Sequence, residues 1–306
     1  MSYYENFMNE LQERICRTLG IAKSDMEFVK KDEKKPSQED RLMILVQRHG
    51  EVSESCCIHT QKLFHYYQTN VSMQQIVQEI SERLCDMKNK DIYNKTKDIE
   101  DYEKVKSKLF IRLLNAERHA DELRNIIYRQ IGDIALTLCL KISDNDKELI
   151  STKISRYVFD NWEKDENEVI EAALANTYHM SSPRLLDLDK FILNFNTYKG
   201  EDFMNEDCQL DDNTTGNVLT TVSRNYGAVA LFLPGVAERI ANLLNSDFYA
   251  VFTSCHEAMI HSAATSDVET LSEAVTSTID NATSEEDFLS YKVYRYSKED
   301  GICVCN

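Results

Sequence analysis

The sequence is poor in the two residues that most often interrupt regular structure. It has eight glycines and three prolines among 306 residues, which is well below average usage. Tight turns built on these residues are therefore few. The composition favours long regular elements, with more helix than strand.

Glycine-rich signatures are missing as well. The chain contains no G-x-x-x-x-G-K-[ST], no G-x-G-x-x-G and no G-x-S-x-G motif. These motifs hold phosphates, hold dinucleotides and expose a serine nucleophile, respectively. Their absence disfavours nucleotide-driven and α/β-hydrolase chemistry, and no cofactor is expected.

Positive charge is also scarce. The chain has 35 basic and 52 acidic side chains, and its formal charge is −17. Such a chain repels phosphate backbones and anionic lipid, so neither nucleic acid nor a membrane is expected as a partner. The acidic surface favours a protein partner or a basic ligand.

Long apolar runs and targeting signals are absent from the sequence. The opening stretch MSYYENFMNELQERI has early acidic residues and no apolar segment, and no uncharged run approaches the ~20 residues that span a bilayer. The sequence has nine cysteines, which is an odd number, and no C-x-x-C motif. We therefore predict a cytoplasmic protein with reduced thiols. Cys303 and Cys305 offer too few ligands for zinc, so no metal is expected there.

The periodicity predicts an α+β protein in two parts. Residues 1–95 form an N-terminal α+β region of a helix, a β-hairpin and further helices, and residues 96–306 form a C-terminal α+β domain. The opening helix has apolar residues every fourth position up to Gly20, and Ser72 with Gln75 forms a capping box. We expect short mixed or antiparallel sheets packed by amphipathic helices, with helix exceeding strand.

Several elements of the C-terminal domain can be predicted from local patterns. Ser182 followed by Pro183 indicates the start of a helix through Phe195. The run GAVALFLP, residues 227–234, reads as a strand, and so do DFYAVFTS and HEAMIHSA.

An acidic loop is expected at about residues 198–216. Six carboxylates and no basic side chain lie between Glu201 and Asp212. The stretch that starts at Asp211 partly follows a calcium-binding loop, but Val222 stands where a bidentate glutamate is required. A mobile, solvated loop is therefore the better interpretation.

The stretch TSCHEAMIHSA, residues 253–263, nearly matches the zinc-protease motif H-E-x-x-H. Its histidines, His256 and His261, are five residues apart instead of four. That spacing turns them about 140° apart on a helix and places them on opposite faces of a strand, so a shared metal is disfavoured. Ser254, His256 and Glu257 are still catalytic candidates. In a strand Ser254 and His256 share a face while Glu257 points to the other side, so a structural role is the competing interpretation.

The region around this stretch carries a wider pattern. A Pro-Gly pair is followed by an amphipathic helix, an S-D-x-Y strand and S-x-H-E before an apolar strand; the matching positions are Pro234, Gly235, Ser246, Asp247, Tyr249, Ser254, His256 and Glu257. This pattern resembles an uncharacterised domain family of anaerobic gram-positive bacteria. The resemblance implies the two-part intracellular architecture and names no reaction.

Two functional interpretations follow from these observations. The first is a non-enzymatic binding or regulatory module for a protein or a small ligand, because every strong catalytic signature is missing. The second is a small hydrolase that uses Ser254 and His256. A structural accessory role, encoded with neighbouring genes, is a third possibility.

Overall fold

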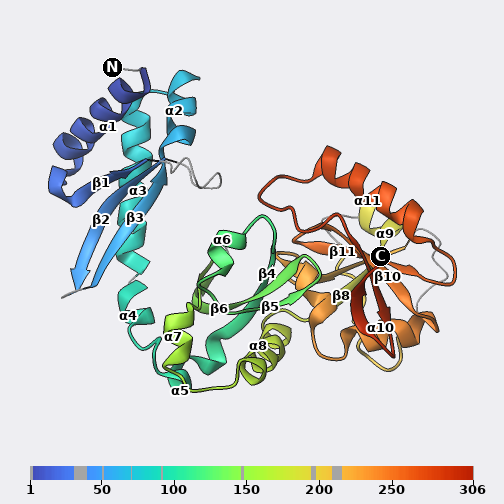
Figure 1. Ribbon diagram of the computed structural model, residues 1–306. Coiled ribbons are helices and arrows are strands. Elements are labelled where there is room, and N and C mark those ends of the chain that lie inside the picture. Colours follow the sequence, from blue (N-terminus) through green and yellow to red (C-terminus); the bar gives the residue numbers. More distant parts are fainter. Residues whose placement is uncertain are drawn as a thin grey trace. The chain divides into compact units, whose positions relative to one another are not determined.

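The chain divides into two compact units in a computed structural model. The structure describes residues 3–30, 40–49, 52–69, 71–90, 92–145, 148–193, 198–208 and 216–305. Unit 1 is Met1–Lys97 and unit 2 is Asp98–Asn306 (Figure 1). Among the described helices, none combines the length and apolar character that crossing a membrane requires.

Unit 1 is built from helices on one face of a three-stranded sheet. Its helices are α1 (Tyr3–Leu19), the 3-10 turn η1 (Lys23–Asp25), α2 (Thr60–Gln68), α3 (Met73–Lys90) and α4 (Ile92–Thr96). Its strands are β1 (Met26–Val29), β2 (Arg41–His49) and β3 (Val52–His59), in the order β1-β2-β3.

The predicted helix signals of unit 1 are present in the structure. The apolar stripe of α1 is buried, and α1 ends at Gly20, whose φ is +67°. The Ser72 N–H donates to Gln75 Oε1 and the Gln75 N–H donates to Ser72 Oγ, which is the reciprocal pattern of a capping box. These local signals confirm the starts and ends that the sequence indicated.

The core of unit 1 lies between α1, α3 and the inner face of the sheet. Leu42 lies opposite Ile58 and Ile44 lies opposite Cys56, and all four side chains are buried against the helices. The β-hairpin predicted for this region corresponds to the antiparallel pair β1 and β2. Strand β3 was not predicted from its polar sequence VSESCCIH, in which Cys56 and Ile58 are the buried positions among the residues whose burial is described.

Unit 2 begins with a four-stranded antiparallel sheet. The first elements are α5 (Tyr102–Val105), η2 (Lys106–Lys108), β4 (Leu109–Asn115), α6 (Ala120–Leu123), β5 (Tyr128–Ile131), β6 (Ile134–Asn145), β7 (Glu148–Lys153), α7 (Arg156–Asp160) and α8 (Glu166–Met180). The long strand β6 pairs with β4, β5 and β7. Helix α8 packs on β4, and Thr177 accepts a hydrogen bond from the Ile111 N–H at 2.9 Å.

A second, six-stranded sheet follows in unit 2. Its elements are β8 (Pro183–Asp187), α9 (Leu188–Leu193), β9 (Asn217–Thr221), η3 (Gly227–Phe232), α10 (Val236–Leu244), β10 (Phe248–Ser254), β11 (Glu257–Ser262), α11 (Val268–Ala282), β12 (Val293–Ser297) and β13 (Gly301–Val304). The strand order is β13-β12-β10-β11-β9-β8, and every pair is antiparallel.

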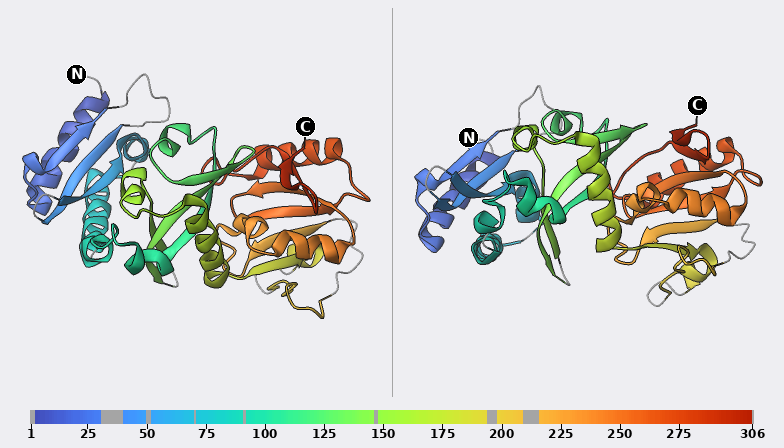
Figure 2. Two further views of the ribbon diagram at one scale, coloured as in Figure 1. Left: turned by 60° about the horizontal axis from the view of Figure 1, so that its bottom comes forward. Right: turned by 90° about the horizontal axis from the view of Figure 1, so that it is seen from below.

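The two faces of the six-stranded sheet are covered differently. Side chains such as Ala250 and Phe252 enter a large core with η3 and α10, and this core continues into the four-stranded sheet. Val251 and Val293 belong to a separate cluster with side chains of α11. Helix α11 lies beside this sheet (Figure 1, Figure 2). Helix α11 contacts β10 and β12, so it covers this face of the sheet over those two strands.

The predicted fold needs correction at the level of the sheets. The described strands form three sheets of three, four and six strands, and every strand pair in them is antiparallel. The expectation of short mixed or antiparallel sheets is therefore wrong and is replaced by three antiparallel sheets, and the class is α+β. Local patterns cannot tell how many sheets a set of strands forms, because pairing depends on contacts between distant segments.

Two element predictions in unit 2 were also wrong. Pro183 begins strand β8, not a helix, because proline suits the first residue of a strand as well as the first turn of a helix. The run Gly227–Phe232 is a buried 3-10 helix, not a strand. Short apolar runs carry no periodicity that separates the two.

Candidate functional site

The stretch TSCHEAMIHSA is a β-hairpin with a two-residue turn. Ser254 ends β10, Cys255 and His256 form the turn, and Glu257 begins β11 directly opposite Ser254. The prediction that Glu257 points away from Ser254 was wrong, because the chain reverses between them. The strands themselves were predicted within about two residues of their observed ends.

An extra residue in β10 concentrates hydroxyl groups on Glu257. Phe252 lies opposite Ala258 and Ser254 lies opposite Glu257, so Thr253 has no partner across the hairpin and forms a bulge. The Thr253 and Ser254 hydroxyls both donate to Glu257 Oε1, at 2.9 and 3.1 Å. One carboxylate oxygen is thereby fixed by two donors.

His256 has a partner at each ring nitrogen. The Tyr226 N–H donates to Nδ1 at 3.0 Å, and Nε2 lies 3.1 Å from Asp287 Oδ1. The neutral tautomer that satisfies both contacts carries its proton on Nε2 and donates it to Asp287. A hydrogen bond from Ser284 and the His256 contact hold the pKa of Asp287 below its usual range.

The backbone around His256 is equally engaged. Its N–H donates to Ser254 Oγ at 3.0 Å, and its carbonyl accepts from the Thr220 hydroxyl at 2.8 Å. Gly227 passes so close that a Cβ there would overlap Thr220 and lie 2.7 Å from the His256 carbonyl oxygen. The turn is thus held by β9, by the loop before η3 and by Asp287.

This arrangement does not form a Ser-His-acid triad. Such a triad needs the serine hydroxyl to donate to a ring nitrogen that is free to accept. Here Ser254 donates to Glu257, and the acceptor nitrogen of His256 already takes the Tyr226 N–H. Ser254 is also buried, with 8% of its surface exposed. The distant acid that orients His256 is present, but the nucleophile is directed elsewhere.

The turn also gathers three types of metal ligand. Single donor atoms of Cys255, His256 and Asp287 lie within 4.8 Å of one another. Burial, with Asp287 adding to it, raises the pKa of the Cys255 thiol to about 12, which keeps it protonated. A metal on His256 Nε2 would move the ring proton to Nδ1, where it would meet the Tyr226 N–H. The existing hydrogen bonds therefore oppose metal binding here.

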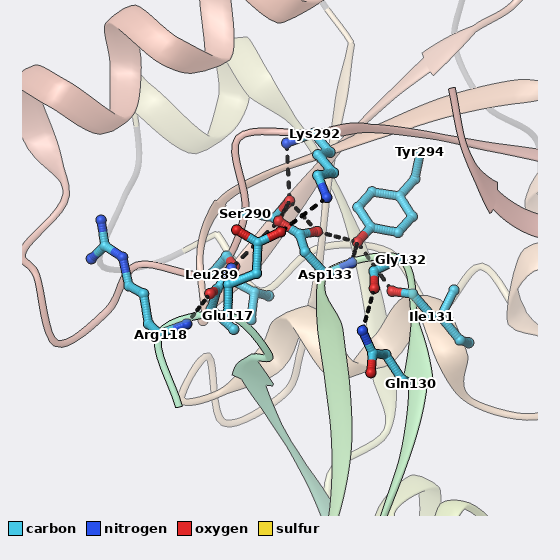
Figure 3. A network of polar contacts seen from close by, with 11 residues as sticks. Glu117, Arg118, Gln130, Ile131, Gly132, Asp133, Leu289, Ser290, Lys292 and Tyr294 are labelled. Carbon is cyan, nitrogen blue, oxygen red and sulfur yellow. Dashed lines mark hydrogen bonds and ion pairs between the residues drawn. The ribbon is translucent and has the colours of Figure 1, made fainter. Parts of the chain in front are cut away.

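A second closed polar network joins the two sheets of unit 2. Asp133, in the turn between β5 and β6, is buried, and Figure 3 shows the hydroxyls of Ser290 and Tyr294 converging on it. These hydroxyls donate to Asp133 Oδ1 at 2.8 and 2.6 Å, and Asn115 Nδ2 donates to Oδ2 at 3.4 Å. Burial and the neighbouring carboxylate raise the pKa of Tyr294, which stays a donor. We call these four residues the Asp133 network.

The uncovered part of the six-stranded sheet is hollowed into a groove. The groove has a volume of about 370 Å³ and lies between α11 and the face of β9, β10 and β11, and Leu188 of α9 also lines it. Its apolar lining residues are Leu188, Val218, Val251, Met259, Leu271, Ala274 and Val275, and its polar ones are Thr253, Glu257, His261 and Thr278. Its volume falls in the range of small-molecule sites, roughly 300–1,000 Å³.

Glu257 and His261 are the titratable groups of this groove. They share a face with Met259 because side chains alternate along β11. Within the described part of the chain, no hydrogen bond reaches Glu257 Oε2 or the ring of His261. Burial lowers the pKa of His261, so its ring is neutral at pH 7.

The site differs from the predicted one in its membership. The structure brings Ser254 and Glu257 together and turns the ring of His256 away from both. Sequence reasoning missed Asp287 and Tyr226, which are far from the hairpin in the chain and belong to no motif. It set His261 aside, and His261 lies in the groove beside Glu257.

The acidic segment after residue 198 is only partly described. Glu201, Asp202 and Asp207 line a polar hollow of about 480 Å³ together with Asp187 and Lys190. The calcium-loop pattern begins at Asp211, and its first five positions, residues 211–215, lie outside the described residues.

The fold and the groove define an α+β protein whose second unit carries a half-covered antiparallel sheet. Its chain belongs to the family described as "Family of unknown function (DUF5688)", which matches residues 4–298. Neither the curated proteins nor the solved structures contain a match.

Proposed function

We propose that the protein is a non-enzymatic binding module and that its second unit takes a small ligand in the groove between α11 and β11. The observation that carries this proposal is the groove itself. Its walls are apolar, and Glu257 is oriented toward it by two hydroxyl donors. Small-molecule sites typically combine an apolar lining with a few fixed polar groups.

The alternative, a hydrolase that uses Ser254 and His256, has less support. Each polar atom that this chemistry would need already has a partner, either in the hairpin or in the segments around Tyr226 and Asp287, and Ser254 is buried. The groove, in contrast, is open to a ligand. Binding without turnover is therefore the better account of these residues.

The binding proposal can be tested with an uncharged apolar dye. We expect N-phenyl-1-naphthylamine to bind the wild-type protein saturably, with increased fluorescence. Ala274→Trp adds an indole to an exposed position that lines the groove, and it should weaken binding at least about tenfold, because the indole occupies the apolar space.

The control is Ala282→Trp, which adds the same ring to the exposed end of α11 outside the groove. It should leave binding unchanged. Absence of saturable binding by the wild type, or equal binding by Ala274→Trp, would refute the proposal.

A further inference from the structure

The charge of the groove restricts the chemistry of its ligand. Among the described lining residues, Glu257 is the one that carries a charge at pH 7, because His261 is neutral and the others are apolar residues or threonines. None of the ion pairs within the described residues includes Glu257. The groove therefore presents one uncompensated carboxylate within an apolar surface.

The two oxygens of this carboxylate are not equivalent. Oε1 accepts from both Thr253 and Ser254, so its position and orientation are set by the hairpin. Oε2 is left as an acceptor for an incoming donor. An acceptor that is already oriented loses little conformational freedom when a ligand binds, which favours affinity.

A cation satisfies this site better than the other ligand charges. A negative ligand would be repelled by Glu257, and a neutral apolar ligand would cover the carboxylate without replacing its hydration. An ammonium group donates a charge-assisted hydrogen bond, which is roughly twice as strong as a neutral one. The formal charge of −17 also raises the local concentration of cations near the protein.

We propose that the ligand of the groove is a primary amine with an apolar chain or ring, whose ammonium group binds Glu257 Oε2 while its apolar part lies between α11 and β9. This inference rests on the proposed function and adds the ligand class to it. The length of the apolar part is limited by the groove of about 370 Å³.

The test uses three probes with the same chain and different charges: hexylamine, 1-hexanol and hexanoate. Their binding to the full-length protein at pH 7.5 is measured by ligand-observed NMR titration. We expect hexylamine to bind at least about tenfold more tightly than hexanol, and hexanoate to bind most weakly. Glu257→Gln should bring hexylamine and hexanol within about threefold of each other.

Glu257→Gln keeps an amide oxygen for the Thr253 and Ser254 hydroxyls, so the hairpin should still fold; circular dichroism and thermal unfolding check this. The matched control is Glu273→Gln, which removes the same charge from an exposed position of α11 outside the groove. It should keep the preference for hexylamine and so exclude a general effect of net charge.

The outcomes separate this inference from the proposed function. If hexanol binds and Ala274→Trp blocks it, but hexylamine binds no better, the amine is wrong and the binding module stands. Equal loss of amine preference in Glu257→Gln and Glu273→Gln would also overturn the inference. If none of the three probes binds although the naphthylamine dye does, the amine is likewise wrong and the binding module stands; if the dye does not bind either, the proposed function fails as well.

Discussion

The hairpin of β10 and β11 uses its polar groups in opposite ways at its turn and along its strand. At the turn, both ring nitrogens of His256 have partners, and Ser254 donates to Glu257. In the groove, within the described residues, Glu257 Oε2 and His261 have none. Ser254 and His256 hold the hairpin in shape, whereas Glu257 and His261 line the groove. The S-x-H-E pattern therefore combines residues with different surroundings, since Ser254 and His256 are engaged at the turn and Glu257 also lines the groove.

The polar groups of the Asp133 network are buried and bonded to one another. Breaking this network should lower the stability of unit 2 more than breaking the hairpin turn. Asp133→Ala removes the acceptor of Ser290, Tyr294 and Asn115. We expect the free energy of unfolding of unit 2 to fall by about 3 kcal/mol or more, because buried donors are left unpaired. Denaturant titration measures this.

Asp121→Ala serves as the control for this measurement. Asp121 is an exposed residue that forms an ion pair with Arg124, and its loss should change stability by no more than about 0.5 kcal/mol. A loss below about 1 kcal/mol in Asp133→Ala would show that the network is not a closed unit.

Removing the His256 side chain from the hairpin turn should lower the stability by less. His256→Ala leaves the Tyr226 N–H and Asp287 without their partner, but both lie near solvent. The expected loss is about 1–3 kcal/mol. His179→Ala, at an exposed position in the last turn of α8, gives the baseline. Equal stability of the two variants would contradict a structural role for His256.

The smallest effect on stability is expected from the protonation of His261 in the groove. Burial lowers the pKa of His261 in the folded protein, so the unfolded chain binds the proton first as the pH falls. The contribution of neutral His261 is complete above the unfolded value of about 6.5 and decreases below it. His261→Gln should therefore lose less stability than the wild type between pH 7.5 and pH 5. Parallel pH profiles of the two proteins would refute this.

Helices and strand positions were largely predictable because their signals are local. The stripe of α1, the Ser72–Gln75 box and the alternating residues of β11 each lie within one short stretch. The grouping of strands into three sheets was not predictable, because it depends on pairing between distant segments. The 3-10 helix η3 was not predictable for another reason, because its short apolar sequence is compatible with either a strand or a helix.

The candidate site was predictable in place and not in geometry. Ser254, His256 and Glu257 lie at the site, but a regular strand predicts the wrong neighbours for them. The unpaired Thr253 and the turn at Cys255 bring Ser254 and Glu257 together. Asp287, which orients His256, could not be found from local spacing because it follows α11, about thirty residues further along the chain.

The bulge at Thr253 makes this hairpin sensitive to insertions and deletions in a particular way. Removing Thr253 would leave the pairs on either side of it, Phe252 with Ala258 and Ser254 with Glu257, in register. It would take away one of the two hydroxyl donors that orient the carboxylate. A deletion of one residue in β10 can therefore leave the strand pairing intact and still loosen the carboxylate of Glu257.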